Sequence, residues 1–391
     1  MIERSILPEL QEIMKTFPAL MLVGPRQIGK TTLAKELATQ LNKPFHYYDL
    51  ENESDLYLLK NNAQEHLRTL QNEVVVLDEV QIHPPLLSSL RSIIDEHRIP
   101  GRFILLGSAD PSLVKGVSES LAGRIIYQEI QQISLPEAID NKISQNQHWF
   151  RGGFPEALLL NTDKAWKLWT ESFIQSYVFR DLNQLFGIQL NPQTIQKLWA
   201  MLAHLNSEIE NFENIGRSLG ITGTTVKKYL EYMEGAYLIR RLNPWYVNQS
   251  KRLVKSPKLY LRTPGILHFM QGINNYDELQ KHPSLGASWE GYVIEQIRTR
   301  LPKSCSLYYY RTRNGAEIDV LIVKGVTPIA GIEIKYSNAP KLSRGFYECI
   351  EDLNLSDNYV ITPSSKAFKL ANGIQVVSLE QFLIEFCKAW D

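Results

Sequence analysis

The chain has 391 residues, which is more than one ordinary core accommodates, so its length predicts two or three domains. Its composition, 44% hydrophobic and 21% charged, is typical of soluble globular proteins. Forty-two basic residues balance forty-two acidic ones, which excludes a global field that attracts nucleic acid or membrane. Such a partner would have to bind through a local patch.

The sequence offers no sign of disulfides, zinc or membrane insertion. Cys305, Cys349 and Cys387 lie far apart and form no CxxC pair, which argues against a disulfide framework and a zinc site. The first residues carry charges where a signal peptide needs an apolar run. We find no apolar stretch of about 18 residues, the length that a membrane span needs. We therefore expect a cytoplasmic chain that does not contact a membrane.

A phosphate-binding loop follows the first apolar run, residues 19–23. Residues 24–31 read Gly-Pro-Arg-Gln-Ile-Gly-Lys-Thr, which matches the pattern GxxxxGK[ST], and a helical pattern follows. Glycines let backbone N–H groups turn toward phosphates, and the helix N-terminus adds partial positive charge. We therefore expect ATP to bind here, with Lys30 at the β- and γ-phosphates and Thr31 ligating Mg²⁺. The competing interpretation is an accidental glycine-rich turn.

A second apolar run, residues 73–77, ends in two acidic residues. In P-loop enzymes the Asp at such a strand end holds Mg²⁺, and a neighbouring Glu activates the attacking water. We therefore expect Asp78 to bind the metal and Glu79 to act as the general base. The residues predicted to contact the nucleotide are Gly24, Pro25, Arg26, Gln27, Ile28, Gly29, Lys30, Thr31, Thr32 and Asp78.

Two further residues are candidates for the ATP site. A third predicted strand, residues 103–106, leads to Ser108, which would lie beside Asp78 and sense the γ-phosphate or the water; the alternative is a serine that caps a turn. Arg124 follows a predicted helix and is a candidate arginine finger that acts on the ATP of a neighbouring subunit in a homo-oligomer. Its alternative is a structural surface arginine.

The middle of the chain is mostly helical. Residues 194–205, 212–219 and 224–234 have helical spacing, with Gly220 at a turn, and residues 236–242 resemble a strand. This order predicts a winged helix, in which Lys227 and Lys228 would point outward as on a DNA-reading helix.

A locally basic stretch follows the predicted winged helix. Residues 240–262 contain seven basic residues and no acid, with Trp245 and Tyr246 among them. Basic residues with interleaved aromatics are typical of contact with a nucleic-acid backbone. The alternative is that the predicted winged helix serves only as a lid or an assembly surface.

The last third of the chain predicts a small α/β domain. Residues 289–297 form an amphipathic helix, and residues 308–311, 317–323 and 331–335 form strands, the first two joined by a turn at Asn314-Gly315. Because side chains alternate along a strand, Glu333 and Lys335 share one face.

These elements carry the PD-(D/E)xK pattern of metal-dependent nucleases. Asp319 would meet Glu333 and Lys335 on the adjacent strand, and Glu290 would complete the metal site from the helix. Carboxylates bind Mg²⁺ beside a phosphodiester, and a lysine activates water or stabilises the developing charge. The predicted metal ligands here are Glu290, Asp319 and Glu333. The alternative is a nuclease-like fold that binds without cutting.

The chain resembles prokaryotic AAA-type ATPases that carry a C-terminal domain of uncharacterised function with a restriction-endonuclease-like fold. The resemblance covers nearly the whole chain, and its blocks are residues 24–34, 77–80, 105–109, 119–124, 152–157, 256–261, 288–297, 315–322 and 332–337. It implies nucleotide roles for Lys30, Thr31, Asp78, Glu79, Ser108 and Arg124.

Together these observations predict an α/β protein with three regions. Residues 1–135 form a P-loop parallel sheet with flanking helices, residues 136–270 a helical and winged-helix region, and residues 271–391 a nuclease-like domain. The first functional hypothesis is a Mg²⁺-ATP hydrolase that acts on DNA through a C-terminal nuclease site. The alternatives are an ATP-dependent switch that binds protein or nucleic acid without cutting, and an assembly module in which ATP sets the oligomeric state.

Overall fold

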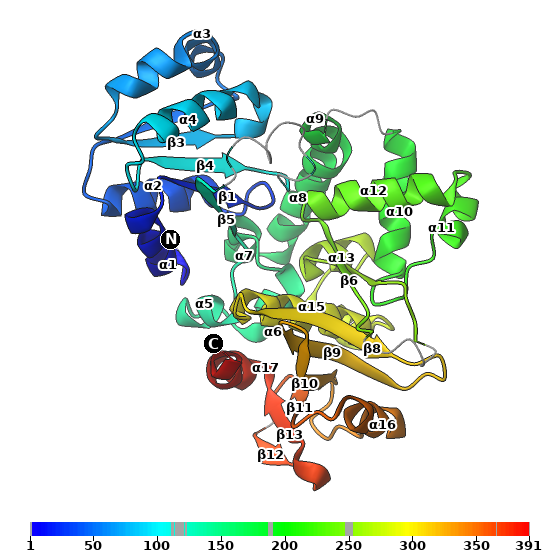
Figure 1. Ribbon diagram of the computed structural model, residues 1–391. Coiled ribbons are helices and arrows are strands. Elements are labelled where there is room, and N and C mark those ends of the chain that lie inside the picture. The colour runs from blue at the N-terminus through cyan, green and yellow to red at the C-terminus, as the bar shows by residue number, and fades with distance from the viewer. Residues whose placement is uncertain are drawn as a thin grey trace.

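The computed structural model describes residues 2–110, 113, 121, 123–186, 191–246, 253–364 and 366–390. The N-terminal region is a parallel sheet of strand order β2-β3-β4-β1-β5 (Figure 1). Its strands are β1 (Ala19–Val23), β2 (Phe45–Asp49), β3 (Val74–Asp78), β4 (Phe103–Gly107) and β5 (Ile125–Glu129). Every residue of β1, β3 and β4 is buried, which explains why these strands are continuous apolar runs rather than alternating ones.

Helices cover both faces of this sheet. They are α1 (Leu7–Thr16), α2 (Lys30–Gln40), α3 (Glu53–Thr69) and α4 (Pro85–Glu96). In Figure 1, α1 and α2 lie on one side of the sheet, and α3 and α4 lie on the other. Right-handed crossovers produce this arrangement, because the chain reverses its direction across the sheet after β2. The phosphate-binding loop therefore lies at the carboxyl edge, where parallel α/β sheets bind ligands.

The middle region is built mostly from helices. They are α5 (Leu135–Asp140), α6 (Gln145–Arg151), α7 (Pro155–Leu159), α8 (Asp163–Phe173), a π-helical continuation (Ile174–Asp181), α9 (Leu182–Phe186), α10 (Pro192–His204), α11 (Phe212–Leu219), α12 (Gly223–Gly235) and α13 (Pro264–Met270). Helices α10, α11 and α12 each have an N-terminal capping residue, namely Asn191, Asn211 and Thr222. The side chain of each accepts a hydrogen bond from a backbone N–H group in the first turn of its helix. Strands β6 (Ile239–Leu242) and β7 (Lys258–Leu261) pair antiparallel. The predicted helices and strand are confirmed, and each end lies within three residues of its predicted position.

The C-terminal region is a mixed sheet of strand order β12-β13-β11-β10-β9-β8. Its strands are β8 (Cys305–Arg311), β9 (Glu317–Lys324), β10 (Thr327–Ile334), β11 (Asp357–Thr362), β12 (Phe368–Lys369) and β13 (Gln375–Ser378). Its helices are α14 (Tyr276–Lys281), α15 (Leu285–Arg300), α16 (Arg344–Leu353) and α17 (Leu379–Gln381). The predicted hairpin is the antiparallel pair β8–β9. In Figure 1, α15 runs between the helices of the middle region and the C-terminal sheet.

A buried ion network joins the three regions. Arg262, just after β7, donates to Glu129 of the N-terminal sheet at 2.5 Å and to Glu295 of α15 at 3.1 Å. Arg240 of β6 also pairs with Glu295. Burial alone would raise the pKa of Glu129, but Arg262 and Arg240 outweigh it and hold this pKa at about 2. Opposite charges from all three regions therefore compensate one another in the interior.

The middle region also borders the edge of the C-terminal sheet. The backbone N–H of Trp245 donates to the carbonyl of Tyr309 at 2.7 Å, and that of Val254 donates to the carbonyl of Arg311 at 3.1 Å. Both acceptors belong to β8, the edge strand. Trp245 and Val254 thus form hydrogen bonds with carbonyl groups of β8 that would otherwise be exposed at an open sheet edge.

Two fully buried histidines join the middle region to α15. His148 contacts the Ile133 carbonyl and the Tyr292 hydroxyl, both at 2.8 Å. His268 contacts the Phe150 carbonyl and the Ser288 hydroxyl. A carbonyl only accepts, so in each neutral ring one nitrogen donates to the carbonyl and the other accepts from the hydroxyl. Burial lowers the pKa of both rings to about 4.

Within the described ranges, no helix is both long and apolar enough to cross a membrane.

The buried histidines predict that acid weakens the fold. An unfolded histidine has a pKa of about 6.5, whereas each of these rings has a pKa of about 4 in the fold, so their stabilisation is complete above pH 6.5 and decreases as the pH falls toward 4. Between about pH 7.5 and about pH 5.5 we expect the apparent free energy of unfolding to fall by about 1 kcal/mol per histidine. Urea unfolding followed by tryptophan fluorescence measures it. Over this pH interval the free energy of unfolding of His268→Gln should fall by about 1 kcal/mol less than that of His97→Gln, a control at an exposed histidine. Equal decreases in the two variants would contradict the conclusion that His268 is neutral in the fold.

Candidate functional site

The phosphate-binding loop joins β1 to α2 with a backbone that glycine permits. Gly24 has φ +151°, and a Cβ atom there would lie 2.6 Å from the Ile130 carbonyl oxygen. Gly29, which precedes α2, has φ +92°, in the left-handed region. Gln27, between them, has φ 60°. These conformations close the loop around the N-terminus of α2, where N–H groups without helical partners are available to an anion.

Lys30 is buried in this loop and makes three hydrogen bonds. Its ammonium donates to the carbonyls of Gly24 and Pro25, both at 2.9 Å, and to the Ser108 hydroxyl at 3.1 Å. Burial lowers its pKa to about 8, although Glu79 and Asp78 act in the opposite direction. None of the three hydrogen-bond acceptors is charged, so phosphate oxygens offer this ammonium a stronger partner.

Thr31 and Asp78 meet where the Mg²⁺ site is predicted. The Thr31 hydroxyl donates to the Asp78 carboxylate at 2.7 Å, and the Tyr47 hydroxyl donates to the same oxygen at 2.8 Å. A threonine hydroxyl and an aspartate carboxylate are the protein ligands with which P-loop enzymes hold Mg²⁺. The residues therefore fit the ion, and Tyr47 orients the carboxylate.

Glu79 and Ser108 lie next to this pair. The Ser108 hydroxyl is fully buried and donates to the Glu79 carboxylate at 2.7 Å, so Lys30, Ser108 and Glu79 form one hydrogen-bonded chain. Glu79 has φ 54°, an unusual conformation for a residue other than glycine. Its side chain also accepts from Gln81. Both residues thus lie at the predicted position, and their catalytic roles stay predictions.

A mostly apolar cavity of about 310 Å³ opens beside the loop. Its walls come from the N-terminal segment, the phosphate-binding loop with α2, and the region around α7: Ile2, Arg4, Ile28, Gly29, Thr32, Leu33, Glu36, Ile133, Pro155 and Leu159. The volume is in the range of ligand pockets.

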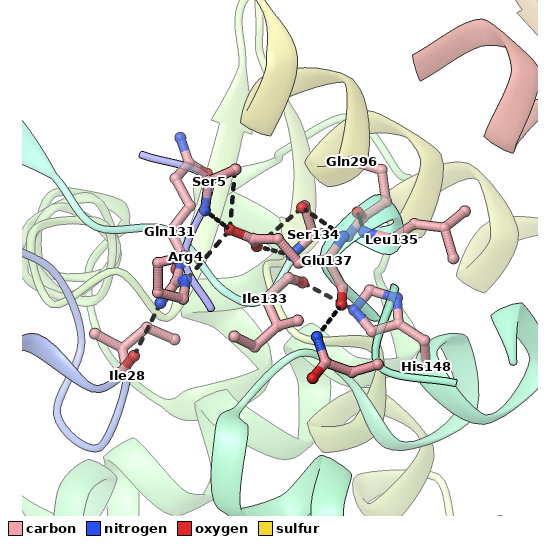
Figure 2. A network of polar contacts seen from close by, with 11 residues as sticks. Arg4, Ser5, Ile28, Gln131, Ile133, Ser134, Leu135, Glu137, His148 and Gln296 are labelled. Carbon is pink, nitrogen blue, oxygen red and sulfur yellow. Dashed lines mark hydrogen bonds and ion pairs between the residues drawn. The ribbon is translucent and has the colours of Figure 1, made fainter. Parts of the chain in front are cut away.

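Figure 2 shows a polar network that includes three residues of the cavity wall, Arg4, Ile28 and Ile133. Arg4 donates to the Ile28 carbonyl of the loop at 3.4 Å and to the Gln131 carbonyl at 2.6 Å, and it pairs with Glu137 of α5. The backbone N–H of Leu135 donates to the Gln296 side chain of α15 at 2.7 Å. The segment from residue 131 to 137 is thus linked to the phosphate-binding loop through Arg4 and is hydrogen-bonded to α15 through Gln296.

The two predicted arginines lie in different places. Arg26, in the loop, pairs with Glu51 after β2, at the carboxyl edge. Arg124 precedes β5, whose first residue pairs with the first residue of β1, so it lies at the opposite edge from the loop. There it donates to Asp95 at 2.6 and 2.8 Å. Arg124 therefore does not reach the ATP site of its own chain, and the predicted helix before it lies largely outside the described residues.

The structure brings together the residues of the predicted nuclease site. Lys335 pairs with Glu333 at 2.6 Å, which confirms that they share a face. The Asp319 carboxylate accepts from the backbone N–H of Ile334 at 2.8 Å. Burial, with the nearby charges of Glu333 and Glu290, raises the pKa of Asp319 well above its usual range. Like charges thus lie close together in a partly buried cluster.

A lysine from the middle region occupies this cluster. Lys258 of β7 is 4% exposed, and its ammonium lies 3.1 Å from Glu290 and 2.5 Å from Glu317. Glu290 also accepts from the hydroxyls of Ser207 and Tyr260, at 2.8 and 2.6 Å. Burial alone would lower the pKa of Lys258. The negative charges of Glu290 and Asp319 have a larger effect, so the pKa of Lys258 is raised. The cation in this cluster is the chain's own.

The predicted metal ligands do not fit a metal as they are arranged. Among residues that the structure describes, no three His, Cys, Asp or Glu side chains are grouped so that they could hold an ion. Glu290 is the residue that departs from the prediction, because three side chains of the middle region already donate hydrogen bonds to its two oxygens. Sequence spacing located the carboxylates correctly but contained no sign of Lys258.

The basic stretch at 240–262 is mostly internal, in contrast to the prediction. Arg240 pairs with Glu295, Arg241 with Glu210 at 2.7 Å, Lys258 with Glu290, and Arg262 with Glu129 and Glu295. Acids distant in the sequence therefore neutralise these four side chains. Lys255 is exposed, and residues 251 and 252 lie outside the described residues.

Sequence reasoning missed four residues of these sites: Arg4, Tyr47, Lys258 and Gln296. Tyr47 had a usable signal, because it precedes the end of a parallel strand whose carboxyl edge meets that of β3. The other three act across more than 20 residues of sequence and carry no local pattern.

Family models match three parts of the chain. An AAA domain matches residues 16–139. Two domains of unknown function, DUF8612 and DUF4143, match residues 143–277 and 285–382.

Curated relatives and solved structures are also similar to the chain. An uncharacterised protein of Mycobacterium tuberculosis is 34% identical over 380 residues, 97% of this chain and 84% of its own length, and an uncharacterised protein of Mycobacterium bovis has the same values. The Walker-type ATPase of Pyrococcus abyssi has a TM-score of 0.47 at 14% identity, covering 69% of this chain and 96% of that one. A RuvB mutant of Thermotoga maritima has a TM-score of 0.32 at 16% identity, covering 61% and 90%.

The position of Lys258 predicts a large effect of removing its charge. Lys258→Met removes the cation that pairs with Glu290 and leaves Glu317 with Arg311 alone, so we expect the free energy of unfolding to fall by about 3–5 kcal/mol. The double variant with Glu290→Gln should lose less than the single variant, because one uncompensated charge is then absent. Urea unfolding measures both, with Lys255→Met as the exposed control. Strictly additive losses in the double variant would contradict a direct interaction.

Proposed function

The chain belongs to the family of those uncharacterised mycobacterial proteins, and we propose that it is a Mg²⁺-dependent ATP hydrolase that works as a switch. The observation that carries this proposal is the hydrogen bond between Thr31 and Asp78 beside Lys30, at the carboxyl edge of the sheet. These are the groups that P-loop enzymes use for metal and phosphates.

Each residue of the ATP site has a role in this proposal. Lys30 exchanges its two loop carbonyls for oxygens of the β- and γ-phosphates. Thr31 and Asp78 would hold Mg²⁺, which would supply positive charge to neutralise the phosphates. Glu79 accepts a proton from the attacking water, and its hydrogen bond from Ser108 holds the carboxylate in place. Ser108 also contacts Lys30, so it responds when the ammonium moves to a phosphate.

ATP occupancy reaches the C-terminal region through the network in Figure 2. The cavity beside the loop, which we assign to the base and sugar, is lined by Ile28 on one side and by Ile133 on the other. Ile133 accepts a hydrogen bond from His148, and His148 accepts one from Tyr292 of α15. A nucleotide that bridges the two walls therefore restrains the segment to which α15 is bonded.

We further propose that the C-terminal region binds a partner without cutting nucleic acid. Lys258 supports this, because its ammonium lies among the carboxylates that a nuclease would offer to Mg²⁺. The alternative, a metal-dependent nuclease, is favoured by the convergence of Asp319, Glu333 and Lys335. A homo-oligomer remains a further proposal, in which Arg124 acts on the ATP of a neighbouring subunit.

The role of Glu79 predicts separate effects on binding and turnover. Glu79→Gln should lower the ATP hydrolysis rate by about 100-fold or more, because it removes the general base, and should leave ATP affinity within about twofold. Lys30→Ala should abolish turnover. Phosphate release and fluorescent-ATP titration measure the two quantities, with Glu53→Gln, an exposed glutamate of the same region, as the matched control. Loss of ATP binding in Glu79→Gln would refute this assignment.

The switch proposal predicts no cleavage of DNA. Supercoiled plasmid incubated with the chain and Mg²⁺, with or without ATP, should remain intact to the same degree as with Asp319→Ala, because Lys258 and not a metal neutralises the carboxylates. Gel electrophoresis of the plasmid measures this. Nicking by the natural chain alone would establish the nuclease alternative, and its dependence on ATP would show whether the two sites are coupled.

A further inference from the structure

A polar groove of about 610 Å³ separates the N-terminal region from the end of α15. One wall carries Arg298, Arg300 and Lys303, and the other carries Tyr127, Gln128 and Gln131 from β5 and the segment after it. A second cavity of about 340 Å³ shares Arg298 and Lys303 and extends toward β6. Arg298 and Lys303 therefore line both cavities.

The charges of this groove are not balanced. Its two carboxylates already have partners: Glu9 pairs with Lys303 at 2.6 Å, and Glu129 pairs with Arg262. In the part of the chain that the structure describes, the side chains of Arg298 and Arg300 make no ion pair and no hydrogen bond. The Nε atom of Arg300 is buried without a partner. Burial and the neighbouring Arg240 lower the pKa of Arg298, although the charges of Glu129 and Glu295 act in the opposite direction.

The helix dipole alone does not explain these arginines. Both lie in the last turn of α15, where a positive charge stabilises the helix by about 0.3–1 kcal/mol. A fully exposed side chain provides the same benefit, whereas both arginines are partly buried in a cavity wall. A partly buried guanidinium without a hydrogen-bond partner is costly, which an arriving anion would offset.

The opposite wall indicates which anion fits. Tyr127 is 39% exposed and offers a ring on which a base can stack, and the amides of Gln128 and Gln131 line the groove beside it. Arginine forks bind phosphates in a bidentate manner, and glutamine side chains hydrogen-bond to the backbone of nucleic acids. A cationic wall facing an aromatic ring is the arrangement with which proteins hold single strands.

We propose that this groove, through Arg298, Arg300 and Tyr127, binds the phosphodiester backbone and one unpaired base of a single-stranded nucleic acid. The two arginines bind successive phosphates, and Tyr127 stacks on the base between the two walls. The groove borders β5 of the ATPase sheet and α15 together, so a bound strand contacts both regions that the switch connects.

Binding of the full-length chain to a fluorescein-labelled oligothymidylate of about 15 nucleotides tests this, by anisotropy at about 50 and 200 mM salt. The double variant Arg298→Gln with Arg300→Gln should bind about tenfold more weakly or worse. Its slope of log affinity against log salt concentration should be shallower by about 1.4, because each phosphate contact on a single strand contributes about 0.7 to that slope. Tyr127→Ala should weaken binding about tenfold without changing that slope.

The matched control is Lys227→Gln with Lys228→Gln, which removes the same charge from the exposed face of α12 and should bind like the natural chain. Unchanged binding in the arginine variant, loss of binding in the α12 variant, no binding by the natural chain, or equal competition by polyglutamate would each overturn the proposal. Thermal melting and ATP turnover of the same preparations should be unchanged in the arginine variant. Because turnover is measured separately, failure of the ATPase proposal is distinguished from failure of this one.

Discussion

Arg262 is the side chain on which the relation between the regions depends. Its guanidinium bonds to Glu129 at the end of β5 and to Glu295 in α15, so one buried cation fixes the ATPase sheet, β7 and α15 relative to one another. Such a group adds little net stability, because desolvation of the charges offsets their attraction. Its effect is on geometry: removal of any one member leaves an uncompensated buried charge. The positions of α15, and hence of Glu290 near its start and Arg298 near its end, follow from this constraint.

Two buried lysines in the chain differ in what surrounds them. The partners of Lys30 are carbonyls and a hydroxyl, and burial lowers its pKa to about 8. The nearest partners of Lys258 are carboxylates, which raise its pKa. A lysine ammonium bonded to neutral oxygens forms a stronger interaction when it moves to a phosphate. An ammonium paired with carboxylates would leave buried negative charges uncompensated if it moved away. This contrast is why we assign ligand binding to the first site and a closed, structural state to the second.

Local patterns predicted a large part of this molecule. The loop at 24–31, the strand that ends at Asp78 and the helices of the middle region are set by neighbours within a few residues, and the structure has them close to the predicted positions. The alternation along β9 and β10 likewise placed Asp319, Glu333 and Lys335 on one face. Charge patterning failed, because the basic residues of 240–262 find their acids elsewhere in the chain, and a sequence window cannot contain such partners. The same limit concealed Lys258 and Arg4.

The C-terminal sheet depends on parts of the chain that precede its own first helix. Backbone groups of Trp245 and Val254 cover the edge of β8, and Lys258 neutralises Glu290 and Glu317. A fragment limited to residues 271–391 would therefore have an open strand edge, and Glu290 would lose the lysine that pairs with it. Recombination during evolution could not transfer this domain alone to another protein without supplying both. We therefore expect the C-terminal region and the middle region to occur together when either is found in another protein.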